Sequence, residues 1–359
     1  MRLLVIEPGI RLWGSERAFL SSLPALIPVC EHLVIVAPPE AELIEELSNY
    51  DVKVEVADIG YLSRRGYISR IKIALHLIKI CRKHRIDRIY LNQAGLCRVV
   101  HAVARLLKLP TIMHVRLVED IPRCAALKAT ENAPIDLIFV SNDMQARYSE
   151  KQTPELYKRL FTVYDPYELG DGEDCLVERP IEVACVGRLA EMKGQAELIE
   201  ALAICRDRGS NMDLHFIGAP ADNDPYGSKL ALRVEELGLQ DKVVFLGYRS
   251  DATQYMRSCK LVAVPSRYET LGRVIYEAWE AGAMPMCSRD SGGAAEMLIA
   301  SGGGMLYDGH SPGSIASALC EAASLSEQER CARVEKGRKW ARENLCLSAY
   351  RGRLTGVLF

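Results

Sequence analysis

The sequence lacks any uncharged apolar run of about 18 residues, the length that a membrane-crossing helix needs. It opens with MRLLVIEPGI, where Glu7 interrupts the apolar run before it reaches the length of a secretory signal. Its 12 cysteines are scattered and form no Cys-x-x-Cys pair. We therefore expect a cytoplasmic protein with free thiols, and we predict no transmembrane helix, signal peptide, disulfide or zinc site.

No sign of charge dominates the 359 residues either. The 45 Lys and Arg nearly balance the 47 Asp and Glu, and the formal net charge is -2. Such a chain has no general attraction to nucleic acid, and no nucleic-acid partner is predicted. The charge is unevenly divided, since residues 1–165 carry 23 Lys and Arg against 19 Asp and Glu. We expect this first half to meet the more acidic partner.

Short apolar runs alternate with segments of helical period along the chain. This alternation predicts parallel sheets with right-handed crossovers. Six strands are predicted in each half, at RLLVIEP, HLVIVAP, VKVEVAD, RIYLN, TIMHVR and LIFVS, and then at VACVGRL, DLHFIGA, KVVFLGY, KLVAVPS, MPMCS and GMLY.

Between the halves lies VYDPYELGDGEDCLVERP, a polar stretch with Gly and Pro that is typical of a linker. The predicted fold class is therefore α/β, with two Rossmann-like, doubly wound parallel-sheet domains at residues 1–165 and 172–344. Ligands of such sheets bind beyond the carboxyl ends of the strands. We expect the site in a central cleft that the two domains face.

The loop after the first predicted strand reads EPGIRLWGSERAFL. Gly9 and Gly14 have no side chains, so they leave space for a ligand above this loop. Free N–H groups at the start of the following helix attract phosphate. The Gly-x-Gly-x-x-Gly fingerprint is absent, which argues against a nicotinamide enzyme. A purely structural turn is the alternative for these glycines.

The loop VGRLAEMKGQ places two cations between a strand and the next helix. Arg188 can bind two diphosphate oxygens as a fork, and Lys193 supplies a mobile point charge. These residue types therefore favour a diphosphate site, and ordinary surface charges are the alternative.

The segment 264–288, VPSRYETLGRVIYEAWEAGAMPMCS, carries two acids eight residues apart. Glu269 precedes the predicted helix, and Glu277 lies about a turn and a half inside it. An anionic ligand at the helix start, near Leu271 and Gly272, would have one carboxylate on each side. The alternative is that acids merely stabilise the helix start, which is how we interpret Glu280.

Together these loops resemble the retaining GT-B glycosyltransferases of family 4, the group 1 type. The resemblance is carried by Glu-x7-Glu continuing as EA-x-x-AG-x-x-P, and by GR-x4-KG in VGRLAEMKGQ. It continues in V-x-F-x-G within KVVFLGYRSD and in GG-x-x-E within SGGAAEMLIASGGGMLY. It is strong from about 181 to 310, and looser before 165, where WGSERAFL and the histidine strand TIMHVR carry it.

The resemblance implies transfer of a sugar from a nucleoside diphosphate sugar to a hydroxyl of a glycan or lipid-linked acceptor. The anomeric configuration would be retained, and neither a metal nor another cofactor would be needed. Protein groups would then stabilise the leaving diphosphate. The implied groups are the side chains of Arg188 and Lys193 and the backbone N–H groups of Gly14, Thr270, Leu271 and Gly272.

The same resemblance gives further residues their expected roles. Glu269 would hold hydroxyls of the donor sugar, and Glu277 those of the ribose. His114 would lie on the acceptor-side wall and touch the donor sugar, and a hydrogen-bonded strand histidine is the alternative. The base would lie near Gly247, Tyr248 and Arg249, and Glu296 would shape the back of the donor pocket.

The chain departs from the family pattern at two places. His114 is followed by Val-Arg where an aspartate is usual, and Tyr-Asp-Pro at 164–166 replaces the usual asparagine–glycine. The last residues, 345–359, are expected to form a helix that packs back on the first domain, as the last helix does in GT-B enzymes.

The segment 64–88 is strongly basic, with Asp87 as its single acid. We interpret it first as a sheet-packing helix with a solvated basic face. The alternative is that this face docks peripherally on anionic lipid at the inner face of the membrane. The apolar stripe of the docking face is expected to consist of Ile71, Ile73, Ala74, Leu77, Ile78 and Cys81.

Two other function classes stay open at the level of the sequence. A sugar-nucleotide epimerase of similar two-domain fold would act on one substrate without an acceptor. A non-enzymatic, two-lobed small-molecule-binding protein would not need a diphosphate clamp. The Glu-x7-Glu loop argues against the epimerase, and the two cations at 188 and 193 argue against the binding protein.

Overall fold

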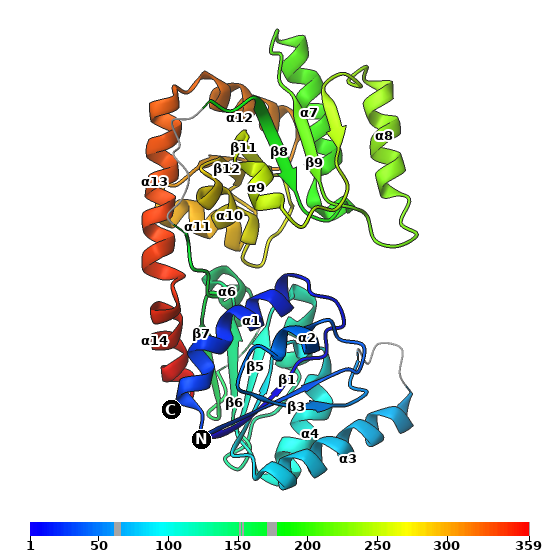
Figure 1. Ribbon diagram of the computed structural model, residues 1–359, viewed down its shortest axis with the longest axis vertical. Helices are drawn as coiled ribbons and strands as arrows, with labels where there is room; N and C mark the ends of the chain where they lie inside the picture. The colour runs from blue at the N-terminus through cyan, green and yellow to red at the C-terminus, as the bar shows by residue number, and fades with distance from the viewer. Residues whose placement is uncertain (61–65, 151, 153, 171–177, 359) are drawn as a thin grey trace. The chain divides into compact units, whose positions relative to one another are not determined.

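A computed structural model describes residues 1–60, 66–150, 152, 154–170 and 178–358. The chain forms two compact units, one made of Met1–Glu168 with Asn344–Phe359 and the other of Leu169–Glu343. Each unit consists of a parallel sheet flanked by helices (Figure 1). The second domain was expected to begin at residue 172, which lies outside the described residues.

The first unit contains a parallel sheet of seven strands. Its central strands are fully buried apolar runs, as is typical of strands that helices cover on both faces. In spatial order the strands are β3 (Lys53–Val56), β2 (His32–Ala37), β1 (Arg2–Ile6), β4 (Arg88–Leu91), β5 (Thr111–Val115), β6 (Ile135–Phe139) and β7 (Lys158–Thr162).

The helices of the first unit follow the strands in the alternating order that the sequence predicts. They are α1 (Gly14–Leu26), α2 (Leu43–Leu47), α3 (Tyr67–His84), α4 (Cys97–Leu107), α5 (Ile121–Ala125) and α6 (Asn142–Ser149), with short 3-10 turns η1 (Ile27–Val29), η3 (Ala94–Leu96) and η4 (Val118–Asp120).

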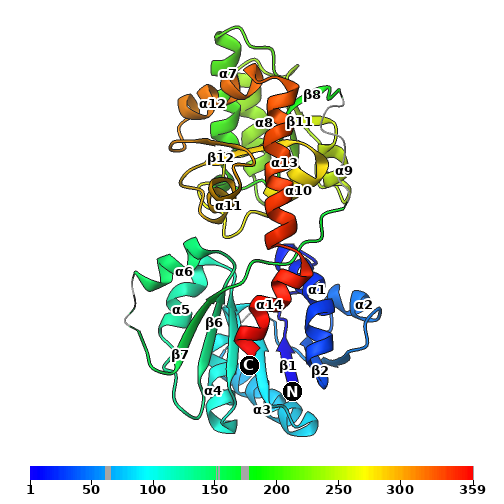
Figure 2. The same ribbon diagram turned by 90° about the vertical axis from the view of Figure 1, so that its left-hand side faces the viewer.

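Strand β7 was not predicted, and the expectation of six strands in this half is wrong. β7 pairs with β6 at the margin of the sheet (Figure 2). β7 begins with Lys158 and Arg159, so the search for continuous apolar runs did not detect it. Charged residues are nevertheless common on edge strands. Arg159 donates to Asp136 on β6 at 2.7 Å, and Lys158 donates to the Leu127 carbonyl at 2.7 Å.

Helix α14 (Leu347–Leu358) belongs to the first unit although it ends the chain. Tyr350, Leu354 and Val357 are buried, and they join the core that contains Phe19 and Leu23 of α1. The two helices lie side by side (Figure 1). The last turns of the chain therefore complete the core of the unit in which the chain begins.

Helix α3 has two apolar stripes, and the predicted docking stripe is the wrong one. Ile73, Leu77 and Cys81 are buried, so they face the protein interior and cannot reach a membrane. The exposed apolar residues of α3 lie nearer its start, at Tyr67, Ile68, Ile71 and Leu75. Arg64 and Arg65, also part of the predicted face, lie outside the described residues.

The second unit contains a parallel sheet of six strands, which are the six predicted there. In spatial order they are β10 (Val243–Phe245), β9 (Leu214–Ile217), β8 (Ile181–Val186), β11 (Cys259–Val264), β12 (Met284–Ser288) and β13 (Met305–Tyr307). The prediction of an α/β protein with two doubly wound parallel sheets is confirmed.

The helices of the second unit again alternate with the strands. They are α7 (Gln195–Asp207), α8 (Tyr226–Glu236), α9 (Ala252–Met256), α10 (Arg273–Ala281), α11 (Gly293–Ser301), α12 (Pro312–Ser324) and α13 (Glu327–Asn344), with the 3-10 turn η5 (Glu191–Lys193). Among the described helices of both units, none combines the length and the hydropathy needed to cross a bilayer.

Replacement of Leu354 tests whether α14 is part of the core. Leu354→Ala should lower the free energy of unfolding by roughly 2–5 kcal/mol, because it removes a buried side chain and leaves a cavity. The exposed neighbour Thr355 is the matched control, and Thr355→Ala should change stability by no more than about 0.5 kcal/mol. Urea denaturation measures both. Equal effects would contradict the packing of α14.

Candidate functional site

The strand order of the second unit reverses between β8 and β11. From β8 the chain moves to β9 and β10 on one side, whereas β12 and β13 lie on the other side of β11. In doubly wound sheets ligands bind at such a switch point, outside the carboxyl ends of the strands. The loops that follow β8 and β11, at 187–194 and 265–272, carry most of the predicted donor-site residues.

Lys193 and Glu269 meet at this switch point. The Lys193 Nζ lies 2.6 Å from Glu269 Oε1, which also accepts a hydrogen bond of 2.6 Å from Ser266 Oγ. The side chains of Lys193 and Glu269 are 26% and 16% exposed, so a ligand can reach both. The sequence predicted both residues, from loops 76 positions apart, and the structure brings them together.

Backbone contacts hold the Glu269 loop in place. The Glu269 N–H donates to the Ser291 carbonyl at 3.2 Å, and its carbonyl accepts from the Gly293 N–H at 2.8 Å. Gly292 has a φ of 60°, and a Cβ there would lie 2.7 Å from the Glu269 carbonyl oxygen. A side chain at 292 would therefore push the two loops apart.

The loop before α7 is held against the loop after β11 in the same way. The Arg267 N–H donates to the Met192 carbonyl at 3.0 Å. A Cβ at Gly194 would lie 2.3 Å from the Pro265 carbonyl oxygen, so only glycine permits this approach. The backbone thereby fixes the positions from which Lys193 and Glu269 project.

Helix α10 begins next to Glu269, and Gly272 is its N-cap residue. Glu277 lies in the second turn, 20% exposed, and accepts a long hydrogen bond of 3.4 Å from Arg273 Nη2. The first turn of α10 contains no acid. The capping interpretation of Glu277 is therefore weakened, because the helix dipole acts mainly within the first turn. Leu271 is buried, whereas Thr270 is partly exposed.

Arg188 lies at the start of the β8 loop and is exposed. Its carbonyl accepts from Gln195 Nε2 at 3.0 Å, and Gln195 is itself buried at the start of α7. The loop conformation is thus set by a buried amide, and the guanidinium of Arg188 is left accessible to a ligand.

The predicted base loop, 247–249, follows β10 at the edge of the sheet, with β9 between it and β8. Tyr248 is exposed, and Arg249 pairs with Asp251 at 2.6 Å and stacks over the Tyr255 ring at 5.1 Å. Glu296 lies in the first turn of α11 and is partly buried. The roles of these residues toward a base or a donor stay predictions.

The sheet of the first unit has its own switch point, between β1 and β4. Gly14 is the first residue of α1 there, close to Glu16, which the sequence predicted as a cap of this helix together with Ser15. The buried Glu16 carboxylate accepts from Trp13 N–H at 3.2 Å and from Gln93 Nε2 at 2.6 Å. The acid thus satisfies a free N–H of the helix start, and a role of Gly14 toward phosphate stays a prediction.

Glu7 is a second acid at this switch point, at the end of β1, and no role was predicted for it from the sequence. It is fully buried, and Oε1 accepts from the Gly9 N–H at 2.9 Å and from Gln93 Nε2 at 2.8 Å, while Oε2 accepts from Asn92 Nδ2. Burial raises the pKa of Glu7 from 4.5 to about 7, and the charge of Glu16 acts in the same direction. Glu7 could have been recognised from the sequence, because it is a single acid directly after the apolar run of a buried strand.

The two departures from the family pattern prove to be partners. Arg116 Nη1 donates to both oxygens of Asp165, at 2.6 and 2.8 Å, and Nη2 donates to Asn92 Oδ1 at 3.0 Å. Arg116 and Asp165 are 6% and 5% exposed. Either charge alone would be costly at that depth, so the two substitutions stabilise one another.

His114 is fully buried on β5, and its Nδ1 lies 2.8 Å from the Tyr90 hydroxyl. Nε2 has no hydrogen-bond partner within the described part of the chain. Burial, together with the charge of Arg116, lowers the pKa of His114 well below its ordinary value. His114 is therefore a neutral strand histidine here, and its contact with a sugar stays a prediction.

The sequence was also expected to contain no Asp-x-Asp triplet, and this expectation is wrong, because residues 222–224 form one. It follows β9, and Asp224 Oδ1 accepts from the Tyr226 N–H at 3.0 Å at the start of α8. This carboxylate therefore serves as a local helix cap. Across the described ranges, no three His, Cys, Asp or Glu side chains gather as a metal-ligand set.

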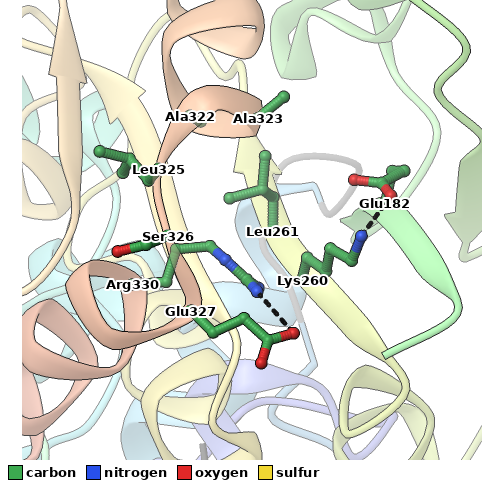
Figure 3. A pocket seen from close by; sticks show the side chains of 9 residues that line it. All are labelled: Glu182, Lys260, Leu261, Ala322, Ala323, Leu325, Ser326, Glu327 and Arg330. Carbon is green, nitrogen blue, oxygen red and sulfur yellow. Dashed lines mark hydrogen bonds and ion pairs between the residues drawn. The ribbon is translucent and has the colours of Figure 1, made fainter. Parts of the chain in front are cut away.

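A small cavity of about 220 Å³ lies elsewhere in the second unit, lined by the starts of β8 and β11 and by the turn between α12 and α13 (Figure 3). Lys260 and Glu182 face each other there at 2.5 Å. These residues lie at the amino ends of the strands, the opposite edge from the switch-point loops. The cavity therefore does not belong to the candidate site.

The family model for glycosyl transferases group 1 matches residues 175–340. Residues 175–340 therefore resemble the group 1 glycosyl transferases. This match covers the switch point, the Lys193–Glu269 pair and helix α10, and it confirms the resemblance that the motifs predicted. The first unit lies outside the match.

Curated relatives also match part of this chain. A D-inositol 3-phosphate glycosyltransferase of Corynebacterium glutamicum is 36% identical over 141 residues, which is 38% of this chain and 34% of the relative. A GDP-mannose-dependent alpha-(1-6)-phosphatidylinositol monomannoside mannosyltransferase of Mycobacterium tuberculosis is 31% identical over 175 residues, 46% of this chain and 43% of the relative. The matched chain thus spans less than half the length of either relative.

Solved structures extend the likeness to the whole chain. Anabaena Alr3699/HepE, determined in complex with UDP-glucose, has a TM-score of 0.80 at 19% identity over 100% of this chain and 99% of its own. The lipopolysaccharide outer core galactosyltransferase WaaB has a TM-score of 0.73 at 14% identity, with 100% and 99% covered. The predicted GT-B fold is confirmed for the chain as a whole.

Titration tests the raised pKa of Glu7. Between pH 4.5 and about 7 the folded state holds a proton at Glu7 that the unfolded state has released, so stability falls as the pH rises. Glu7→Gln does not titrate. The difference in free energy of unfolding between wild type and Glu7→Gln should therefore fall by roughly 2–3 kcal/mol across this window. Urea denaturation at several pH values measures it, and a flat difference would disprove the shift.

Proposed function

We propose that the protein is a retaining glycosyltransferase that moves a sugar from a nucleoside diphosphate sugar to a hydroxyl of a glycan or lipid-linked acceptor. The observation that carries the proposal is the Lys193–Glu269 contact of 2.6 Å at the switch point of a group 1 domain. It supports the proposal because a cation suited to phosphate and a carboxylate suited to sugar hydroxyls lie side by side. The solved relative with UDP-glucose supports a nucleotide-sugar donor.

In the proposed reaction the bond between the anomeric carbon and the diphosphate breaks, and the diphosphate leaves with the electron pair. Negative charge then develops on the diphosphate oxygens, where Lys193 and Arg188 stabilise it. The N–H groups at the start of α10, from Thr270 to Gly272, add partial positive charge. Fixed donors placed where charge develops are an effective means of catalysis. On this proposal protein cations supply the positive charge, and no metal is needed.

The two acids of the 264–288 segment act on different parts of the donor. Glu269 accepts hydrogen bonds from hydroxyls of the sugar and stabilises the positive charge that grows at the anomeric carbon. Glu277, in the second turn of α10, accepts from the ribose hydroxyls. The new bond joins the acceptor oxygen to the anomeric carbon with retained configuration, and the proton of the acceptor hydroxyl passes to the leaving diphosphate.

The acceptor side of the proposal includes peripheral contact with an anionic membrane. Helix α3 carries five Lys and Arg and no acid. Each cation near an anionic surface contributes on the order of 1 kcal/mol. The exposed Tyr67, Ile68 and Leu75 give the same helix an apolar surface that a bilayer can cover.

Ligand binding to the Lys193→Ala protein tests the donor site. One of uridine, guanosine, adenosine or cytidine diphosphate should raise the apparent stability of the wild type by roughly 2.7 kcal/mol at 100 times its dissociation constant. Lys193→Ala should lose most of this shift and lower transfer by roughly 10²–10³-fold. Arg267→Ala removes an exposed cation that pairs with Glu197 in the first turn of α7, and it should change neither the stability shift nor the transfer rate.

Thermal unfolding and transfer assays, run with excess chelator, provide these measurements. No shift with any of the four diphosphates would refute the donor site. An absolute requirement for a divalent cation would refute the metal-free step.

The division of labour between the two acids predicts different kinetic defects. Glu277→Ala should raise KM for the donor with a smaller effect on kcat, since the ribose does not change during the reaction. Glu269→Ala should lower mainly kcat. Its affinity for the nucleoside diphosphate should stay equal or rise, because Lys193 loses its ion-pair partner. Glu280→Ala, one turn further along α10, is the control and should behave as wild type.

Steady-state kinetics and calorimetric titration with the diphosphate separate these outcomes. Loss of diphosphate binding in Glu269→Ala, with normal binding in Glu277→Ala, would reverse the assignment. Normal kinetics in both variants would show that Glu269 and Glu277 have only a structural role.

A further inference from the structure

The first unit contains a cavity of about 670 Å³ that neither the motifs nor the comparisons assign. Its wall is formed by the first half of α3, by η3 and α4, and by the segment that includes η4 and the start of α5. Gln93 and Gly95 follow β4, and Leu117 follows β5, so the cavity lies at the carboxyl ends of these strands. Its volume and place suit a small-molecule ligand.

The charged side chains of this cavity favour an anionic group. Three arginines line it, Arg70 on α3, Arg98 on α4 and Arg123 on α5. Arg123 donates to the buried Asp120 at 2.7 Å, and that pair is neutral as a unit. Glu119 is the other acid in the wall, and it is exposed.

The positive charges of Arg70 and Arg98 are not neutralised by an ion pair within the described residues. Both side chains are exposed. Helix α3 adds further cations without a single acid. Guanidinium groups are well suited to phosphate, which they can bind with two parallel hydrogen bonds.

The rest of the wall is apolar, and the apolar surface continues outside the cavity. Inside, it is formed by Ile71, Ala74, Val99, Ala102 and Leu117. Ile71 also belongs to the exposed stripe of α3, because Tyr67, Ile71 and Leu75 are four residues apart and share one helix face. Tyr67 and Leu75 are 78% and 61% exposed. Exposed apolar surface of this extent next to a cavity indicates an apolar ligand or surface.

The cavity is linked to the switch point of the same sheet through one amide. Gln93 lines the cavity, and its Nε2 donates to both Glu7 and Glu16 at the ends of β1 and the start of α1. A ligand in the cavity therefore lies beside the crevice where doubly wound sheets bind their substrates.

We propose that this cavity binds the acceptor, and that the acceptor is an amphiphile that carries a phosphate group on an apolar chain. The phosphate contacts Arg70 and Arg98, and the apolar chain lies along Ile71 and Leu117 toward the exposed stripe of α3. The word acceptor rests on the proposed function, whereas binding of such an amphiphile does not. The proposal narrows the acceptor from a glycan or lipid-linked hydroxyl to a lipid phosphate.

Calorimetric titration of the full chain, without any nucleotide, tests the ligand class. The probe is dodecyl phosphate below its micelle concentration, compared with inorganic phosphate and with dodecyl maltoside, a neutral amphiphile with the same chain. Dodecyl phosphate should bind with one-to-one stoichiometry and at least tenfold more tightly than either comparison. Equal binding of inorganic phosphate would show an anion site without a place for the chain. Equal binding of dodecyl maltoside would show nonspecific apolar contact, and either result overturns the proposal.

Three variants locate the binding in the cavity. Arg98→Gln should weaken dodecyl phosphate binding about tenfold, because a charged hydrogen bond is lost. Ala102→Phe adds a side chain to an exposed position of the wall and should weaken binding at least as much by filling the cavity. Arg105→Gln removes an exposed arginine of the same helix outside the wall and should bind as wild type. Unchanged binding in both cavity variants, with circular dichroism unchanged, would refute the site.

Donor binding, measured separately with the nucleoside diphosphates, distinguishes this proposal from the proposed function. Dodecyl phosphate binding without diphosphate binding would sustain the cavity and refute the glycosyltransferase. Diphosphate binding without dodecyl phosphate binding would refute the ligand proposed for the cavity and leave the proposed glycosyltransferase function standing.

Discussion

The guanidinium of Arg116 determines the arrangement of the carboxyl edge of the first sheet. It reaches from β5 to Asp165 beyond β7 and to Asn92 beyond β4, and Asn92 in turn donates to Glu7 at the end of β1. Four strand ends are thereby joined through one buried cation. Since an unpaired charge at this depth destabilises a fold by several kcal/mol, the edge keeps its geometry only while the whole set is present. Both the crevice at β1 and β4 and the arginine-lined cavity beside it depend on that set.

The second unit organises its edge by a different physical means. There the loops are joined by backbone hydrogen bonds from Glu269 to Ser291 and from Arg267 to Met192, and by glycines that allow close approach. The charged side chains are consequently not needed to hold the loops. Lys193 and Glu269 are therefore available to a ligand, whereas the buried charges of the first unit are committed to structure.

The sequence predicted the strands, helices and motif residues that local patterns mark. It did not predict features that depend on residues far apart in the chain. The buried strands were recognised because their apolar runs are continuous, and β7 was missed because Lys158 and Arg159 interrupt the pattern at an edge. In α3 the helical spacing of apolar residues predicted an apolar stripe. Spacing alone could not distinguish the helix face that packs on the protein from the face that is exposed. The motifs marked Lys193 and Glu269 singly. Arg116 and Asp165 looked like two unrelated departures, because no local rule pairs residues 49 positions apart.

The ion pair between Lys193 and Glu269 makes binding depend on two chemical groups of a ligand at once. While it is intact, each charge already has its counter-ion, so the site presents little net field to passing ions. A ligand that offers only a phosphate takes Lys193 and leaves Glu269 with the Ser266 hydroxyl alone, and a free sugar does the opposite. On the proposed function, only a molecule that brings both groups at the right separation compensates for both losses. The pair thereby selects the intact sugar nucleotide over the fragments that its hydrolysis would release.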